Sequence, residues 1–229
     1  DTADGIFSAG SWHHIEVSAL FANSGGDVTI WVDGVAVHNS TGDTLATASA
    51  DAIDRIVLSG GTGTTGSTYF DDVLVWDEVG SDFASTQILA HKIETLDVDG
   101  DSAVDFTGAG TGSANFDRVD DAGFHDGDVS HVEGNTVGDV DLYTVESQSV
   151  EPTETLAVSV CAVLRKNTAL LTNARVKLKH GSTTENGGTV ILSETYGFIQ
   201  HHWGQNPDTS ADWGTTDVNA VIAGIEYVS

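Results

Sequence analysis

A run of aspartates between Asp97 and Asp105 has the spacing of a candidate metal site. In Asp97-Val-Asp-Gly-Asp-Ser-Ala-Val-Asp105, carboxylates stand at relative positions 1, 3, 5 and 9. Calcium takes several oxygen ligands at about 2.3–2.6 Å, and calcium loops use such spacings. The stretch departs from the helix-flanked calcium loop, because Gly100 and Gly108 stand where that loop has other residues. The stretch is either a calcium site or a hairpin turn on an acidic surface. The ligands of the calcium site would be Asp97, Asp99, Asp101 and Asp105.

The other residues that could do chemistry form no complete constellation. His13-His14 and His201-His202 are adjacent pairs, and neighbours on a strand point to opposite faces, so neither pair chelates one metal alone. Cys161 is the single cysteine, which excludes a disulfide framework and a cysteine zinc site. No Gly-x-Ser-x-Gly elbow supports a serine nucleophile. With 35 acidic residues, some pair falls at glycosidase spacing by chance, so we expect no enzyme.

Three further features each have a functional and a plain interpretation. Gly60 to Gly66 is glycine-rich but has no lysine, so it is a loop rather than a phosphate cradle. Several tryptophans could stack on sugar rings or could anchor the core and loops: Trp12, Trp31, Trp203 and Trp213. A dense acidic loop is interpreted as hydrated surface carboxylate, and contains Asp117, Asp120, Asp121, Asp126 and Asp128.

The charge of the chain limits its partners and its surroundings. It has 35 acidic and 8 basic residues and a net charge of −27. This charge repels nucleic acid and anionic membranes, so we expect no nucleic-acid partner. Self-repulsion acts over a Debye length of about 10 Å at 0.1 M salt and about 3 Å at 1 M. We therefore expect a high-salt environment; the alternative is an ordinary acidic surface of a secreted protein or virus particle.

The pattern of apolar residues predicts a folded β protein. Hydrophobic residues make up 39% of the chain and fall in alternating runs, which argues against disorder. The 26 glycines and only 2 prolines suit a turn-rich β fold. No apolar run of about 18 residues is present, so we expect no membrane insertion. The chain has no methionine and no signal peptide, so we expect a mature product or a fragment.

In the first half, alternation predicts strands at 13–21, 27–33, 35–38, 53–58 and 69–77, followed by a strand at 87–96. The odd positions Ile15 to Phe21 are expected to face inward. Asp33-Gly34 predicts a tight hairpin turn. Gly80 to Ser85 is expected to be a boundary loop, which gives two all-β units, 1–85 and 86–229.

In the second unit, residues 97–140 are rich in Asp and Gly and are expected to be largely loop. Strands are predicted at 155–164, 174–180, 189–192, 196–203 and 224–228. A turn at 185–188 is expected to join two of them as a hairpin. A short helix is expected at 216–221, capped by Thr215 or Thr216.

Four motifs in the first unit resemble the second half of a laminin-G or concanavalin-A-like jelly roll. They are Trp12-His-His-Ile-Glu-Val17, Ile30-Trp-Val-Asp-Gly34, Ile53-Asp-Arg-Ile-Val57 and Tyr69-Phe-Asp-Asp-Val-Leu-Val75. The resemblance implies a partial jelly roll completed by strands upstream of Asp1. It also implies a calcium site near a sheet rim, for which Asp71 and Asp72 are candidates; the alternative is that both lie at the strand edge.

The second unit resembles the domain that follows such a jelly roll in structural proteins of tailed viruses. The matching stretches are Asn115-Phe-Asp-Arg-Val-Asp-Asp121, Asp126-Gly-Asp128, Thr136-Val-Gly-Asp-Val-Asp-Leu-Tyr143 and Trp203 to Gly224. The resemblance covers residues 92–229 and implies a second antiparallel β-sandwich on a virus particle, with no catalytic residues to carry over.

Together these features predict a non-enzymatic structural protein of a tailed virus of a saline host. A head decoration, turret or tail fibre is expected, with other virion proteins and further copies of itself as partners. Host-surface glycan is a further expected partner. The alternatives are a carbohydrate-binding, lectin-like module and, with no specific support, a polysaccharide-degrading enzyme on the same fold.

Overall fold

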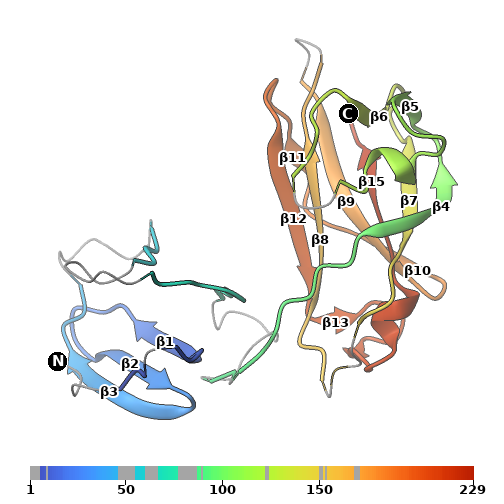
Figure 1. The fold of residues 1–229 in the computed structure, drawn as a ribbon. Coiled ribbons are helices and arrows are strands. Elements are labelled where there is room, and N and C mark those ends of the chain that lie inside the picture. The colour runs from blue at the N-terminus through green and yellow to red at the C-terminus, as the bar shows by residue number, and fades with distance from the viewer. Residues whose placement is uncertain are drawn as a thin grey trace. The chain divides into compact units, whose positions relative to one another are not determined.

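The computed structural model describes residues 6–8, 10–45, 55–59, 67–76, 87–88, 90–121, 124–149, 152, 154–167 and 171–229. The chain divides into two compact units, Asp1–Ile93 and Glu94–Ser229 (Figure 1). Its sheets are antiparallel, which confirms the expected all-β class. Among the described residues, no helix has the length and apolar character needed to cross a bilayer.

The first unit contains a three-stranded antiparallel sheet in the order β1-β2-β3. Its strands are β1 (Ile15–Leu20), β2 (Gly26–Val32) and β3 (Val35–Gly42). The predicted hairpin between β2 and β3 is confirmed, because Asp33 and Gly34 have φ of +50° and +79°, the pattern of a type I′ turn. The Asp33 carboxylate also accepts hydrogen bonds from the His14 amide at 2.9 Å and from the His13 ring at 2.8 Å.

The expected inward face of the first strand was wrong. Ile15 and Val17 are 51% and 55% exposed, whereas Glu16 on the opposite face is 4% exposed. The Glu16 carboxylate accepts a hydrogen bond from the Ile88 amide at 2.6 Å, so residues near Ile88 lie against this face of the strand. Alternation separates the two faces of a strand, but it does not decide which face the rest of the chain covers.

Three other strands expected near this sheet are also not formed in their described parts. Residues 55–58, 69–76, 87–88 and 90–96 carry no strand. Asp72 has φ of +52°, a left-handed conformation that interrupts an extended strand. Ile53 and the loop at Gly80 to Ser85 lie outside the described residues.

The second unit is a two-layer antiparallel sandwich. Its larger sheet has the order β10-β9-β15-β7-β4, with β11 also paired to β9. These strands are β4 (Val98–Val104), β7 (Val140–Val145), β9 (Asn173–His180), β10 (Thr183–Asn186), β11 (Val190–Ile191) and β15 (Ile222–Tyr227). The smaller sheet pairs β8 (Val158–Leu164) with β12 (Gly197–Trp203). The expected strands over β8, β9, β12 and β15 are thereby confirmed.

The core of this unit lies between the two sheets. Val160 and Ile199 of the small sheet pack with Val176 and Leu178 of β9, and Leu178 has no exposed surface. The remaining buried members of this core are Trp203, Trp213, Val221 and Ile225. Alternate residues of β8 and β12 therefore point into the core, and the residues between them form an outer face.

Most of the described part of the stretch at 97–140 is loop, as expected, but short elements interrupt it. β5 (Thr107–Gly110) pairs with β6 (Ser130–Glu133), and a 3-10 turn, η1, spans Phe116–Arg118. β4 is an edge strand with mostly exposed residues. It therefore lacks the apolar alternation by which strands are recognised.

Two turns near the C-terminus differ from expectation in detail. The tight turn after β9 is at Gly181-Ser182, where Gly181 has φ of +56°. Glu185 and Asn186 of the turn expected at 185–188 therefore belong to the strand β10, while the expected pairing of 174–180 with 189–192 is present between β9 and β11. The expected short helix is a 3-10 turn, η2 (Asp217–Ala220), and its N-cap residue, Thr216, makes no side-chain cap bond. A small pair, β13 (Gln205–Asn206) and β14 (Ala211–Asp212), lies between β12 and η2.

A fully buried carboxylate joins β7 to the segment that follows β4. Asp141 has no exposed surface. One of its oxygens accepts hydrogen bonds from the Asp105 and Phe106 amides, both at 2.8 Å. The other accepts from the Asn115 side-chain amide at 2.7 Å and from the Tyr143 hydroxyl at 2.8 Å. Burial, and then the bond to Asp141, raises the pKa of Tyr143, which keeps its hydroxyl a donor.

The segment from Trp203 to Asp217 is fixed by a second buried network. The Trp213 indole donates to the Trp203 carbonyl at 2.8 Å, and both tryptophans belong to the core. Asn206, which has no exposed surface, donates from its side-chain amide to Asp217 at 2.7 Å. Its side-chain oxygen accepts from the Asp208 amide at 3.0 Å. The two tryptophans are therefore core anchors rather than sugar platforms.

Candidate interaction surface

The outer face of the small sheet is a row of cross-strand pairs. Since β8 and β12 are antiparallel, Val163 lies opposite Phe198, Cys161 opposite Gln200, and Ser159 opposite His202. Just beyond the strand ends, the Arg165 guanidinium lies over the Tyr196 ring, 5.2 Å from its centroid. We call these residues the outer face: Ser159, Cys161, Val163, Arg165, Tyr196, Phe198, Gln200 and His202.

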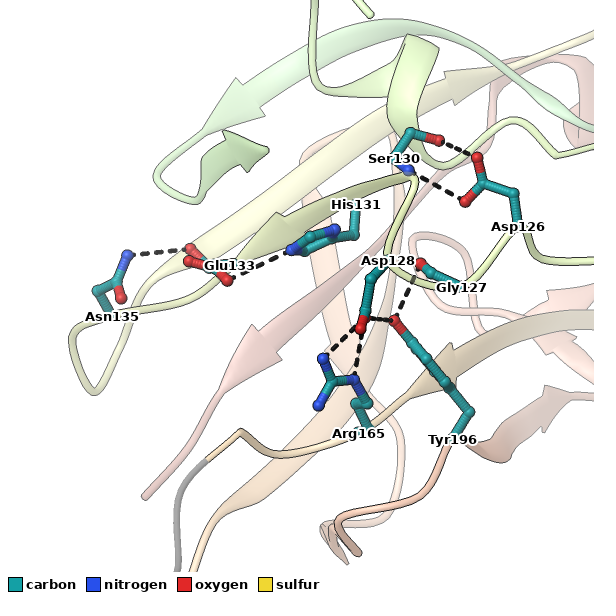
Figure 2. Close-up of polar contacts among 9 residues, drawn as sticks. All are labelled: Asp126, Gly127, Asp128, Ser130, His131, Glu133, Asn135, Arg165 and Tyr196. Carbon is teal, nitrogen blue, oxygen red and sulfur yellow. Dashed lines mark hydrogen bonds and ion pairs between the residues drawn. The ribbon is translucent and has the colours of Figure 1, made fainter. Parts of the chain in front are cut away.

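The charged end of the outer face is fixed by Asp128. One Asp128 oxygen accepts from Arg165 Nη2 at 2.7 Å, from Arg165 Nε at 3.2 Å and from the Tyr196 hydroxyl at 2.7 Å. Figure 2 shows Arg165 and Tyr196 reaching this carboxylate from two separate segments. The Tyr196 hydroxyl also lies 3.0 Å from the Gly127 carbonyl. The cation and the aromatic ring are therefore held in one arrangement before any partner binds.

An aromatic rim extends this end of the surface. The His125 ring lies 4.6 Å from the Tyr196 ring, and the neighbouring Phe124 is 92% exposed. Phe198 is 62% exposed, although it stands in the middle of a regular strand pair. Tyrosine, arginine and phenylalanine are the side chains enriched at the centres of protein interfaces, where acidic residues are depleted.

Hydrogen bonds between side chains link the polar middle of the outer face. The Ser159 hydroxyl lies 2.9 Å from Nδ1 of His202, and the Gln200 amide nitrogen lies 3.2 Å from Nε2 of the same ring. Desolvation by its neighbours raises the pKa of the Cys161 thiol, which disfavours the reactive thiolate. The hydrogen bonds hold Ser159, Gln200 and His202 in fixed orientations on the outer face.

In the dense acidic loop around Asp117 to Asp128, several carboxylates accept hydrogen bonds from nearby backbone amides and serine hydroxyls. The Asp126 carboxylate accepts from the Ser130 amide at 3.1 Å and its hydroxyl at 2.8 Å, as Figure 2 shows. An Asp121 oxygen accepts from the Asp126 amide at 2.9 Å. The Asp117 carboxylate accepts from the Ser113 amide and hydroxyl, and these bonds lower the pKa of Asp117. Aspartate is used here as a cap for turn amides, in addition to its charge.

The candidate calcium ligands lie along the edge strand β4 and at its ends. Asp99 accepts from the Thr144 hydroxyl at 2.6 Å, and Asp101 accepts from the Phe116 amide at 2.8 Å. Asp105 accepts from the Val140 amide at 3.1 Å, and the Asp97 carbonyl accepts from the Glu146 amide at 2.9 Å. In the described part of the chain, no three His, Cys, Asp or Glu side chains are grouped to hold a metal ion. Calcium binding here stays a prediction.

The other candidates from the sequence are Asp71 and Asp72, the pair His201-His202, and the glycine-rich stretch at 60–66. Asp72 accepts from the Ile93 amide at 2.8 Å, and Asp71 accepts from the Asp72 amide at 2.9 Å. His202 faces outward, whereas His201 is half-buried with its ring 4.6 Å from the Trp203 ring, so this pair does point to opposite faces. The glycine-rich stretch at 60–66 lies outside the described residues.

The comparisons with other proteins give no relative for this chain. Searches of family models, curated proteins and solved structures find no match.

Sequence reasoning did not select the outer face, although a signal for it is present. Residues 155–164 and 196–206 contain no acidic residue, in a chain that has 35 of them. Strand pairing converts these two separate stretches into one surface whose strands carry no carboxylate, with Asp128 of the acidic loop at its charged end. The absence of acidic residues from both strands is therefore the sequence signal of this surface.

We expect the Arg165–Asp128 contact to be lost in acid. The hydrogen bond from Tyr196, and then that from Arg165, lowers the pKa of Asp128 below its ordinary 3.8. A carboxyl with a lowered pKa keeps its contacts above the ordinary value and loses them as the pH falls through the lowered one. The chemical shift of the Arg165 side-chain Nε–H should therefore keep its hydrogen-bonded value through pH 3.8 and move toward its free value only at lower pH.

Asp128→Asn should move this chemical shift toward its free value at every pH, whereas Asp126→Asn, in the same loop, should leave it unchanged, because Asp126 bonds to Ser130 instead. An unchanged chemical shift with the same pH dependence in Asp128→Asn would contradict the assignment of Asp128 as the residue that fixes Arg165.

Proposed function

We propose that the chain is a non-enzymatic structural component of a tailed virus particle from a saline environment, and that the outer face is one of its contacts with neighbouring particle proteins. The observation that supports this most is the role of the residues in the resembling stretches. Asn115, Asp141 and Tyr143 form one buried network, and Trp203 and Trp213 belong to the core. The resemblance therefore rests on residues that build a rigid domain.

The charge distribution supports the same proposal. A net charge of −27 keeps copies apart in dilute salt, and molar salt shortens the Debye length to about 3 Å. Short-range contacts then decide which surfaces associate. The two strands of the outer face contribute aromatic groups and no carboxylate, and its arginine is paired with Asp128, so the face is suited to such a contact.

The proposal is tested by locating the protein. An antibody against the second unit should detect it in particles that have been purified on a density gradient in molar salt, in a constant ratio to the major capsid protein. A soluble host enzyme in the same gradient serves as the control for contamination. Chain that stays in the culture fluid and is missing from the particle band would contradict the proposal.

A carbohydrate-binding module is the second candidate, and Trp12 is the observation that favours it. Trp12 is 71% exposed, and an exposed indole can stack on a sugar ring. If the first unit binds host-surface glycan, Trp12→Ala should weaken binding on a glycan array at least about tenfold. Tyr69→Ala is the matched control, because Tyr69 is 74% exposed and belongs to the same unit. Absence of binding by the unchanged protein would remove this candidate.

A further inference from the structure

The strand β12 has a backbone edge that nothing in the described part of the second unit pairs with. It is hydrogen-bonded to β8 on one side, and its sheet contains only these two strands. In Figure 1, β12 lies at the margin of the second unit. Unpaired backbone amides and carbonyls on such an edge are a template for another strand.

This edge lacks the features that normally protect an edge strand. Natural edges are blunted by charged side chains or proline, and the longest strand at each edge of the larger sheet follows this rule. The edge strand β4 carries Asp99 and Asp101, and the edge strand β10 carries Glu185. The sequence of β12, Gly-Phe-Ile-Gln-His-His-Trp, contains no acidic residue, no lysine and no proline. It extends over seven residues, long enough for a regular ladder.

A second copy of this chain is the partner that fits this edge. Over most of their surface two copies meet with like charge, since each has a net charge of −27; the uncharged strand β8 is the exception in the same sheet. At β12 each copy instead presents an uncharged strand beside the outer face. An antiparallel pairing of β12 with itself is self-complementary, as a two-fold interface requires. Its centre falls at Gln200, the middle residue of the strand.

We propose that two copies associate by antiparallel pairing of their β12 strands, which joins their small sheets into one continuous sheet. In this register, Gln200 lies opposite Gln200 of the second copy, and their amides can hydrogen-bond to each other. Phe198 lies opposite His202 of the second copy, an aromatic cross-strand pair. This inference rests on the contact role proposed for the outer face. Because the two net charges repel, association strengthens with salt.

A disulfide tests the register directly. In a Cys161→Ser background, Gln200→Cys should form a disulfide-linked dimer on mild oxidation in molar KCl, since directly opposed residues have Cβ atoms about 4.5–5.5 Å apart. Thr184→Cys in the same background is the matched control: it is exposed on the edge strand β10 and should remain monomeric. Cross-linking of both variants to equal extent, or of neither, would overturn the proposed register.

Sedimentation of the unmodified protein tests the association itself. We expect a monomer in dilute buffer and a dimer in molar KCl, and we expect Phe198→Asp to weaken the dimer at least about tenfold. Near-UV circular dichroism confirms that the variant is folded. A monomer at every salt concentration would overturn the proposal, even if the protein is found in particles. If the protein stays monomeric and the NMR signals of the β12 amides shift when a host-surface oligosaccharide is added, the outer face is a sugar-binding surface instead.

Discussion

Replacing Asp141 with alanine is expected to lower the free energy of unfolding of the second unit by about 3–5 kcal/mol. The carboxylate has no exposed surface and accepts four hydrogen bonds, two from backbone amides and two from side chains. Its removal takes this acceptor from all four donors, of which the Asp105 amide keeps a second bond to the Val140 carbonyl at 3.2 Å. Since domains have total stabilities of about 5–15 kcal/mol, the variant should be close to unfolding. Guanidinium denaturation at constant high salt measures the difference.

Two variants separate this network from a general effect of charge. Asp99→Ala also removes one negative charge, but Asp99 is exposed and bonds to one hydroxyl, so we expect a change within about 0.5 kcal/mol. Tyr143→Phe removes a single donor and should cost about 1 kcal/mol. If Asp141→Ala were as stable as Asp99→Ala, the buried network would not hold the two segments together.

Trp213→Ala should destabilise the same unit by about 3–5 kcal/mol. The indole is 4% exposed, packs in the core and lies edge-on to the His180 ring at 5.8 Å between centroids. Its nitrogen also donates to the Trp203 carbonyl, so truncation leaves both a cavity and a buried carbonyl that has lost its partner. The shift in the denaturation midpoint, followed by far-UV circular dichroism, measures this loss.

Trp213→Phe is the matched variant, since it keeps an aromatic ring in the cavity but cannot donate the hydrogen bond. We expect it to cost about 1–2 kcal/mol, clearly less than the alanine variant. Equal losses for alanine and phenylalanine would mean that the hydrogen bond, rather than the packing of the ring, anchors this segment.

The parts of the fold that sequence predicts well are those in which local chemistry decides the structure. Asp33-Gly34 requires left-handed backbone that few other pairs adopt readily, and the hairpin forms there. β8 and β9 contain strong apolar patterns because both pack against the same core. At these positions the local preference and the tertiary environment agree.

The parts that sequence predicts poorly depend on distant contacts. β4 is a strand because β7 pairs with it, and its own residues are mostly exposed and polar. Residues 69–76 have strand-like alternation, but Asp72 is held in a left-handed conformation with its carboxylate on the Ile93 amide. Ile15 and Glu16 exchange their expected environments because residues near Ile88 lie against the Glu16 side.

The outer face illustrates the same limit for the candidate site. Arg165 and Tyr196 are far apart in sequence, and only the pairing of β8 with β12 brings them into contact. Their common partner, Asp128, comes from the acidic loop, where it is one aspartate among several. Composition predicts that acid-free strands are unusual in this chain, but only strand register joins them into one surface.

The most direct test of the proposed function is a cryo-electron microscopy map of purified particles from cultures that produce this protein. The proposal predicts density for the second unit at symmetry-related positions on the head or tail, with the outer face in contact with a neighbouring protein subunit. Well-resolved particles that lack this density at every symmetric position, while the protein accumulates outside them, would contradict a structural role in the particle.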